Sequence, residues 1–367
     1  MARILILGAG ALARETILAI PQVVQTHDET VTVVVASRDA ARAAWLARLA
    51  AARSFTTGAP LKVESATLDW ANEDGLAATL ATVAPTVILN TASLQSAWSL
   101  DTRNAWNDLV RASGYGVTAA LQAALVPRLG RAIRDAGLSA KVVNGCYPDL
   151  VNAGGRWMGL RIECGIGNVA LLGELFRQEL SVSPRDQLRL IAGHWDVTQF
   201  CSPPNSRTDY PLTWINDRRV AIEEVAHVVP MSGDISMNSL SAGSSAALLY
   251  ALATDGDWVG HVPGPLGEMG GYPVKVIGGS VQIDLPQDIG LPDARSWCLH
   301  RSELDGATME TTGHIYFSPR ATEAVRRFSS DLAGGFHYSE VEAAAKAFVE
   351  LRRELTQRTP GECRVYA

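Results

Sequence analysis

Three small residues near the start of the chain are spaced for binding a dinucleotide. Gly8, Gly10 and Ala13 follow an apolar run at residues 3–7 and lead into a helix-forming stretch, in the order strand, G-x-G-x-x-A turn, helix. In that arrangement Gly8 permits a tight turn, Gly10 lets the backbone approach a pyrophosphate, and the start of the helix offers free N–H groups to the phosphates. The predicted cofactor contacts in this turn are Gly8, Gly10, Ala11 and Leu12.

The residues after the second expected strand indicate which dinucleotide binds. Enzymes that use NAD(H) usually place an acid there, on the ribose 2′-hydroxyl, whereas this chain has Ser37 and Arg38. A serine hydroxyl and a planar arginine cation both suit a 2′-phosphate. Asp39, one residue later, is better placed to cap the helix that follows. The pair therefore favours NADP(H) as cofactor over NAD(H).

Polar residues also follow two further strands of the predicted sheet. Asn90, Thr91 and Ala92 end the strand at residues 85–90, and Asp69 follows the strand at residues 61–68. Parallel sheets bind ligands at the carboxyl ends of their strands. We therefore expect Asp69, Asn90, Thr91 and Ala92 to contact the cofactor, the alternative being polar strand ends that bind nothing.

A histidine after an apolar strand is the candidate for proton transfer. His194 follows residues 188–192, and imidazole suits proton exchange with a carbonyl or an alcohol near neutral pH. Asp196 or Glu163 could orient its ring, although a structural histidine is the alternative. The candidate catalytic residues are His194 as general acid/base, with Asn144 or Tyr147 as the group that polarises the reacting oxygen.

The long segment at residues 91–116 has few features of regular structure. It is rich in Ser, Trp, Asn and Gly, and loops of this length in a compact fold are usually functional. As a lid it would exclude water from hydride transfer and supply a substrate-binding arginine, Arg103 or Arg111. The alternative is an ordinary surface segment whose tryptophans pack inward.

The order of the expected elements indicates an α/β fold. In the first half, strands alternate with helices, which predicts an N-terminal Rossmann domain with a doubly wound parallel sheet. The second half reads as an α+β C-terminal domain, with a helix at residues 163–180, a hairpin turn at Asn216-Asp217 and a helix at residues 238–253. We expect a dinucleotide-binding domain at residues 1–155, and a domain for substrate binding, catalysis and oligomerisation at residues 156–367.

Composition excludes several classes of protein. The chain has 367 residues, 47% hydrophobic and 19% charged, as in ordinary globular proteins. A net charge of −6 argues against nucleic acid as a partner, and no apolar run is long enough to span a membrane. The five cysteines are scattered and form no C-x-x-C pair, so we expect no metal site and a reduced, cytoplasmic setting.

The order of motifs resembles the lactate/malate dehydrogenase superfamily over nearly the whole chain. The resemblance rests on G-A-G at residues 8–10, V-V-N-G-C-Y-P at 142–148, G-I-G at 165–167, G-H-W-D at 193–196 and N-S-L-S-A-G at 238–243. It implies a nicotinamide-dependent dehydrogenase that forms a homodimer or a homotetramer. The last motif resembles the family's helix start beside the substrate, which implies substrate contacts from Asn238 and Ser239.

The chain departs from that family where the family binds its 2-hydroxy acids. The family's helix after the glycine start carries an aspartate that pairs with the histidine and an arginine that grips the substrate carboxylate; the matching positions here are Leu171 and Glu174. The first ninety residues also resemble saccharopine-reductase-type and extended short-chain dehydrogenase domains. We therefore predict an NADP(H)-dependent oxidoreductase of a small carbonyl, alcohol or imine substrate, with a saccharopine-reductase-like imine reductase and a non-catalytic NADP-binding sensor as alternatives.

Overall fold

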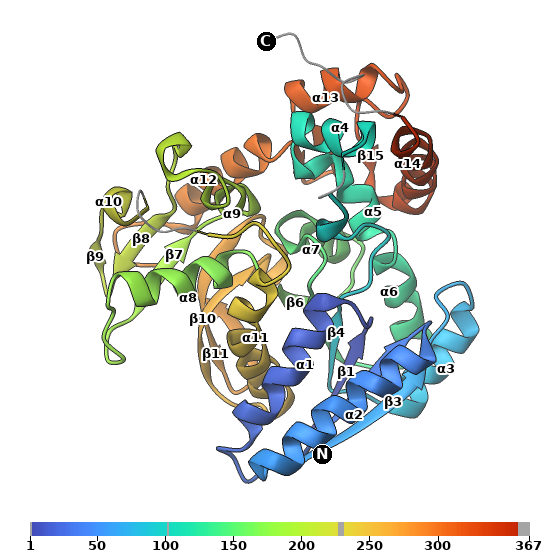
Figure 1. The fold of residues 1–367 in the computed structure, drawn as a ribbon, viewed down its shortest axis with the longest axis vertical. Helices are drawn as coiled ribbons and strands as arrows, with labels where there is room; N and C mark the ends of the chain where they lie inside the picture. The colour runs from blue at the N-terminus through green and yellow to red at the C-terminus, as the bar shows by residue number, and fades with distance from the viewer. Residues whose placement is uncertain (1, 101–102, 227–230, 359–367) are drawn as a thin grey trace.

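A six-stranded parallel sheet forms the centre of the molecule (Figure 1). The computed structural model describes residues 2–100, 103–226 and 231–358. The strand order is β3-β2-β1-β4-β5-β6, which is the doubly wound Rossmann order. The strands are β1 (Arg3–Leu7), β2 (Val31–Ser37), β3 (Leu61–Thr67), β4 (Val87–Asn90), β5 (Lys141–Asn144) and β6 (Ile162–Gly165). The α/β class predicted from the alternation of strands and helices is confirmed.

Helices cover both faces of this sheet because its central strands are apolar on both sides. In β1, Ile4 and Ile6 join a buried cluster with α1 (Ala11–Val24), α2 (Ala40–Thr57) and α11 (Met237–Ala253). Leu5 and Leu7 point the other way and join a cluster that includes α3 (Glu73–Val83), α5 (Ala119–Ala123) and α6 (Val126–Asp135). Such continuous apolar runs are typical of parallel strands buried on both faces.

The sheet extends past the expected domain boundary at residue 155. We expected a helix from residue 163, but residues 162–165 form β6, which pairs with β5, and α8 (Val169–Glu179) begins only afterwards. Residue 155, the expected boundary, lies inside the largely buried helix α7 (Pro148–Trp157). Proline, which is favoured in the first turn of a helix, starts α7. The division into two domains stays a prediction.

Small antiparallel sheets follow in the second half, which confirms the α+β expectation. The first comprises β7 (Leu188–Ile191), β8 (Leu212–Ile215) and β9 (Arg218–Arg219), with the expected hairpin turn at Asn216, whose φ is 56°. The second comprises β10 (Trp258–Pro263), β11 (Gly271–Ile277) and β12 (Ser280–Ile283). Next to them lie α9 (His194–Phe200), α10 (Glu223–Ala226) and α12 (Leu291–Leu304).

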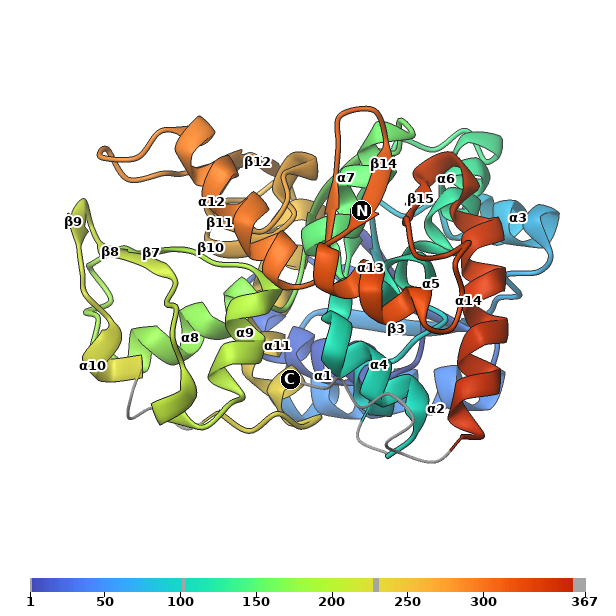
Figure 2. The ribbon, with the colours of Figure 1, turned by 90° about the horizontal axis from the view of Figure 1, so that it is seen from above.

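The C-terminal part of the chain returns to the first half. A third sheet comprises β13 (Ala307–Met309), β14 (His314–Phe317) and β15 (Phe336–His337), and is followed by the long helix α14 (Val341–Thr356), with α13 (Pro319–Arg326) between β14 and β15. In both ribbon views α13 and α14 lie beside α4 (Ala105–Ser113) (Figures 1 and 2). Buried residues of these elements share one cluster with Leu5 and Leu7 of β1. This return brings the loop after α12 to the carboxyl edge of the main sheet.

The segment at residues 91–116 is more regular than expected. It contains a short 3₁₀ helix, η1 (Ala97–Leu100), and α4, with η2 (Tyr115–Thr118) at its end. Trp106 and Leu109 of α4 are buried against α13 and α14, so this part of the segment belongs to the core. Residues 101 and 102 of the segment considered as a lid lie outside the described residues. None of the described helices combines the length and the apolar character needed to cross a membrane.

Candidate cofactor and catalytic site

One cavity of about 780 Å³ runs along the carboxyl ends of the strands. Its walls include residues that follow β1, β2, β4, β5 and β6, together with His194 and the start of α11. The residues after β2 and those after β6 are separated by four strand spacings of about 4.8 Å, or about 19 Å. The cavity therefore crosses the point where the strand order reverses, which is where such sheets bind dinucleotides.

The glycine turn after β1 lines this cavity as the sequence predicted. Gly8 has a φ of 112°, and a Cβ there would lie 2.5 Å from Thr91 Oγ1, so no other residue fits without a shift. Gly10 caps α1 with no side-chain hydrogen bond, and a Cβ on it would meet nothing within 4 Å. The open space in front of Gly10 and the uncapped start of α1 fit a phosphate group. Ala11 and Leu12 line the same wall.

Two arginines stand at the β2 end of the cavity. Ser37, Arg38 and Arg42 line it, and both arginine side chains are exposed. Asp39 caps α2 as expected, because its Oδ1 accepts a hydrogen bond of 2.9 Å from the N–H of Arg42. Among the described residues, no carboxylate forms an ion pair with either guanidinium. The residues present fit an anionic group at this position, and Arg42 is a cation that the sequence analysis did not single out.

Of the four residues predicted to contact the cofactor from the other strand ends, two line the cavity and two do not. Thr91 and Ala92 line the cavity, and Thr91 Oγ1 donates to the carbonyl oxygen of Leu7. Asn90 is buried behind this wall, where its Nδ2 donates to Asn144 Oδ1 at 3.1 Å. Asp69 is exposed and accepts a hydrogen bond from the N–H of Ala71, outside the cavity wall. Thr91 and Ala92 are thus the two that are placed to contact a ligand.

His194 reaches the opposite end of the cavity with a carboxylate behind it. Its Nδ1 lies 2.9 Å from Oδ2 of Asp305, which is 2% exposed. The hydroxyl of Tyr147 donates to the same oxygen at 2.7 Å. Since a carboxylate only accepts, we assign the proton between His194 and Asp305 to Nδ1. Nε2, for which the described residues offer no hydrogen-bond partner, is then left to act on a ligand in the cavity that His194 lines.

An aromatic residue fixes the plane of the imidazole. Tyr115 stacks on His194, with 4.4 Å between the ring centroids and 25° between the planes. The hydroxyl oxygen of Tyr115 accepts a hydrogen bond of 2.7 Å from Gln122 Nε2. Tyr147 meets the imidazole edge-on at 5.3 Å. The ring of His194 is therefore held by one hydrogen bond and two aromatic contacts.

The surrounding charges raise the pKa of His194 above its ordinary value. Burial alone lowers the pKa of an imidazole, but the charge of Asp305, the hydrogen bond to it and the charge of Asp149 outweigh that effect. Burial raises the pKa of the Asp149 carboxyl to about 6, although the charge of His194 and a hydrogen bond from Asn168 oppose it. His194 therefore holds a proton more readily near neutral pH than an exposed histidine does.

The prediction that Asp196 or Glu163 orients the ring of His194 was wrong. Asp196 Oδ2 accepts a hydrogen bond of 2.8 Å from the N–H of Gly193, so this carboxylate caps α9 and turns away from the imidazole. Glu163 pairs with Arg161 at 2.6 Å. The actual partner, Asp305, lies 111 positions along the chain from His194, in the turn between α12 and β13. Only the return of the C-terminal part reveals it.

Of the two groups proposed to polarise the reacting oxygen, Tyr147 lines the cavity and Asn144 does not. Asn144 Oδ1 accepts hydrogen bonds from Asn90 and from the N–H of Cys146, and its Nδ2 donates to Cys146 O and Asn152 Oδ1. These four bonds use the amide within the protein. Asn144 therefore fixes the loop after β5, whereas Tyr147, with a φ of 45°, is placed at the site.

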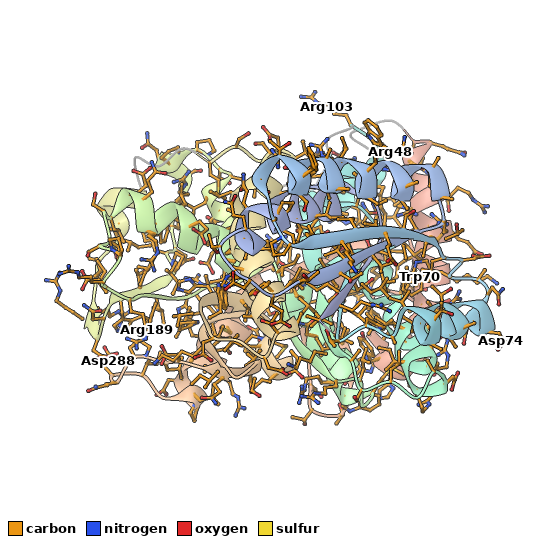
Figure 3. All side chains as sticks on the ribbon, turned by 90° about the horizontal axis from the view of Figure 1, so that it is seen from below. Arg48, Trp70, Asp74, Arg103, Arg189 and Asp288 are labelled. Atoms are coloured by element: carbon orange, nitrogen blue, oxygen red, sulfur yellow. The ribbon has the colours of Figure 1, made fainter. Side chains whose placement is uncertain are left out.

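Of the four residues predicted to contact the substrate, one lines the cavity and three do not. Asn238, at the start of α11, is 8% exposed and lines the cavity, and its Nδ2 has no partner in the described structure. Ser239 donates to Glu15 Oε2 on the surface. Arg111 pairs with Asp108, and the side chain of Arg103 projects from the molecule (Figure 3). Neither arginine lines the cavity.

No metal-binding cluster of histidine, cysteine and carboxylate side chains occurs in the described part of the chain. The described cysteines are free thiols, and Cys363 lies outside the described residues. Burial raises the pKa of Cys146, which lines the cavity, to about 12. That thiol is therefore protonated and packs as a small side chain.

Comparison with solved structures shows which known proteins have a similar fold. A malate dehydrogenase from Picrophilus torridus aligns over 89% of this chain and 99% of its own, with 15% identity and a TM-score of 0.53. A malate dehydrogenase from Archaeoglobus fulgidus in complex with NADH aligns over 83% and 99%, with 12% identity and a TM-score of 0.52. The chain has the fold of these malate dehydrogenases. At these identities the likeness concerns the fold.

The same architecture occurs in proteins named for other reactions. The putative glucosidase lplD from Bacillus subtilis aligns over 97% of this chain and 99% of its own, with 12% identity and a TM-score of 0.53. No protein-family model and no curated protein sequence matches the chain. Because one fold supports several chemistries, the reaction has to be argued from the side chains of the cavity.

Proposed function

We propose that this protein is an NADP(H)-dependent oxidoreductase that transfers a hydride to or from a small carbonyl, alcohol or imine substrate. The observation that carries the proposal is that the glycine turn after β1 and the His194–Asp305 pair line or adjoin one cavity. A dinucleotide bound along the strand ends in the usual way would have its reactive end beside His194. The malate dehydrogenase of Archaeoglobus fulgidus, which has this fold, was solved with NADH.

The side chains supply the proton and fix its path. The bound cofactor would provide or accept the hydride. In the reducing direction, Nε2 of His194 donates its proton to the substrate oxygen or nitrogen as the hydride reaches carbon, and in the oxidising direction it takes that proton back. Asp305 stabilises the imidazolium through Nδ1, and the stacked Tyr115 keeps the ring from turning. Tyr147 is the remaining candidate for polarising the substrate oxygen, and to do so its hydroxyl would have to exchange its hydrogen bond to Asp305 for one to the substrate.

The preference for NADP(H) rests on the β2 end of the cavity. Ser37, Arg38 and Arg42 would hold the 2′-phosphate there, with a hydroxyl donor and two cations. NAD(H) has no phosphate at that position and would leave both guanidinium groups in water. In this proposal the preference for NADP(H) comes from side chains outside the glycine turn.

Transfer of label from the cofactor tests the function before any substrate has been identified. Protein would be incubated with NADPH tritiated at C4 of the nicotinamide and with a mixed set of aldehydes, ketones and imines. Appearance of tritium in an organic product, lost in His194→Ala, supports the proposal. Tight NADPH binding with no transfer to any acceptor would favour the alternative, a non-catalytic NADP-binding sensor. Transfer confined to imines would favour the imine-reductase alternative.

We also infer that the protein is a homodimer or a homotetramer, as the resemblance to the lactate/malate dehydrogenases implies. Static light scattering of the purified protein at micromolar concentration should give at least twice the mass of one chain. A single-chain mass that does not change with concentration would contradict this inference, and would leave the assignment of the cavity unaffected.

A further inference from the structure

Buried carboxylates surround the reaction end of the cavity. Asp305 is bound to the ring of His194, and Asp149 Oδ1 accepts a hydrogen bond of 2.9 Å from its main-chain N–H. Both are 2% exposed. In the described structure neither carboxylate forms an ion pair with lysine or arginine, and the positive charge that acts on both is that of protonated His194. The field at this end of the cavity is therefore negative unless His194 is protonated.

The cations of the cavity lie elsewhere. Among the described residues of its wall, Arg38 and Arg42 are the only lysine or arginine side chains, and they stand at the β2 end. Arg301 lies near the reaction end, but it is 5% exposed, is directed to Asp196 and Asp209 at 3.5 Å, and does not line the cavity. A substrate beside His194 thus meets no guanidinium or ammonium group from the described wall.

An apolar side chain takes the place in the cavity wall where the lactate/malate dehydrogenase family, by the resemblance, carries an aspartate. Leu171 of α8 is buried and lines the cavity. Glu174, one turn further along, bonds to Ser244 and stays outside the wall. A carboxylate entering here would lose its water, pass an apolar surface and approach two negative charges. In a site of low dielectric constant, such like-charge contacts weigh more than in water.

Several other polar groups of the cavity wall are uncharged. Asn238 lines the cavity, and its buried Nδ2 has no hydrogen-bond partner in the described structure. This donor can therefore bind an acceptor atom of a ligand. Ser241, one turn along α11, lines the same wall. Trp98 of η1 is half-buried and adds an aromatic surface. Such a set binds carbonyl and hydroxyl oxygens, and among the described residues of the wall at this end only protonated His194, already paired with Asp305, carries a positive charge.

We propose that the reaction end takes an uncharged polar substrate, namely a ketone or its alcohol with a second neutral oxygen that accepts a hydrogen bond from Asn238, and that it rejects a carboxylate beside the reacting carbon. This inference rests on the proposed function. In the reduction, hydride from NADPH adds to the carbonyl carbon, the C=O π electrons move to oxygen, and oxygen takes the proton from His194. The products are the alcohol and NADP⁺.

Matched pairs of acids and amides test the substrate class. Pyruvate and pyruvamide, and 2-oxobutyrate and its primary amide, have the same skeleton and differ in one charge. We expect kcat/KM with NADPH to be at least about tenfold higher for each amide than for its acid, which is 1.4 kcal/mol. Equal values, or values higher for the acids, would overturn the proposal.

A binding measurement separates this inference from the proposed function. Oxamide and oxamate are unreactive analogues of the two classes, and their binding to the protein–NADPH complex changes the fluorescence of bound NADPH. Tighter binding of oxamide supports the substrate class even if no acceptor turns over, in which case only the proposed function fails. Tighter binding of oxamate, or binding of neither at millimolar concentration, overturns the substrate class whatever the enzyme does.

Two substitutions sharpen the result. Leu171→Arg adds a cation to the wall and should reverse the preference to the acids, whereas the matched control Leu171→Met should keep the preference for the amides. Asn238→Ala should weaken oxamide binding and leave oxamate binding unchanged. If Leu171→Arg fails to fold, as judged by circular dichroism, Asn238→Ala still tests the proposal. An equal loss of affinity for oxamide and oxamate in Asn238→Ala would contradict a role for this amide in selecting neutral oxygens.

Discussion

The two ends of the cavity differ in how they are built and in the sign of their charge. At the β2 end, the turn at Gly8 and Gly10 and the cations Arg38 and Arg42 come from neighbouring positions of the first two strand–helix units. At the other end, His194 meets Asp305 and Tyr147, which belong to three separate parts of the chain. One end therefore attracts phosphate through main chain and cations, and the other holds a proton between carboxylates. Binding and chemistry can be disturbed separately.

The largest effect should come from removing the imidazole. His194→Ala should lower turnover about 10²–10⁴-fold, which is the usual contribution of general acid–base catalysis. NADPH affinity should change little, because the contacts proposed for the phosphate groups of the cofactor lie away from His194. Single-turnover absorbance of the nicotinamide in a stopped-flow instrument measures the hydride step directly. Wild-type hydride transfer in this variant would show that the proton comes from another group, with Tyr147 next to test.

If the two ends act separately, a substitution in the glycine turn should change cofactor affinity without changing the stability of the fold. Gly10→Ala should weaken NADPH binding by about 1–3 kcal/mol, because a methyl group enters the space in front of the turn where the pyrophosphate approaches. Its melting temperature should match the wild type, since the added Cβ meets no protein atom and φ is −76°. Calorimetric titration and thermal unfolding together check both statements.

The matched substitution Gly8→Ala should act on the fold itself. At a φ of 112°, with a Cβ 2.5 Å from Thr91 Oγ1, alanine should lower the free energy of unfolding by about 1–3 kcal/mol. Urea denaturation measures this difference. If Gly8→Ala were as stable as Gly10→Ala, the turn after β1 would be looser than the structure indicates.

The cations at the β2 end should discriminate between the two cofactors. Arg38→Ala should cost about 1.5–3 kcal/mol of NADPH affinity, as for a hydrogen bond to a charged group, and little for NADH. Arg42→Ala should show the same pattern, whereas Arg48→Ala, on the exposed side of α2, serves as the control. Equal affinity of the wild type for NADPH and NADH would remove the argument from Ser37 and Arg38.

The smallest effect concerns pH. The carboxylate of Asp305 raises the pKa of His194, so Asp305→Asn should lower that pKa. Reduction needs protonated His194, and kcat/KM falls as pH rises through its pKa. The pH at which kcat/KM falls should therefore be lower in Asp305→Asn than in the wild type. Asp149, with a pKa of about 6, faces the same histidine, while burial keeps the hydroxyls of Tyr115 and Tyr147 protonated throughout this range.

The control for this shift is Tyr147→Phe, which removes a hydroxyl from Asp305 and keeps the carboxylate beside His194. Its pH profile should keep the upper limb above that of Asp305→Asn. If the fall of kcat/KM with rising pH stays at the same pH in Asp305→Asn, this carboxylate only positions the ring of His194. The argument that negative charge dominates the reaction end would then lose support.

The contrast between the two ends also explains what the sequence could predict. The strand, glycine turn and helix at residues 3–24 are local, so their pattern is sufficient, and Asp39 as a helix cap follows from its type and place. His194 could be proposed from the strand before it, but Asp305 could not, because nothing in the residues near position 305 marks it as a partner. Asn144 and Asn90 read as ligand contacts by position, and only their mutual hydrogen bond shows them buried behind the wall.

The errors in the fold have the same origin. Residues 162–165 contain glutamate and glycine and precede a G-x-G stretch, so locally they indicate the start of a helix. In the structure they are the sixth strand because β5 offers an edge to pair with. Likewise, the segment at residues 91–116 looks irregular until α13 and α14, more than 200 residues later, cover Trp106. Tertiary contacts, which one sequence does not display, decide both cases.

The most direct test of the account is a crystal structure of the protein with NADPH. The account predicts the 2′-phosphate between Arg38 and Arg42, the pyrophosphate over Gly10, and the nicotinamide beside Nε2 of His194 with one face open to the space near Asn238. A nicotinamide turned away from His194, or one whose free face is blocked by protein, would contradict the assignment of this cavity as an oxidoreductase site.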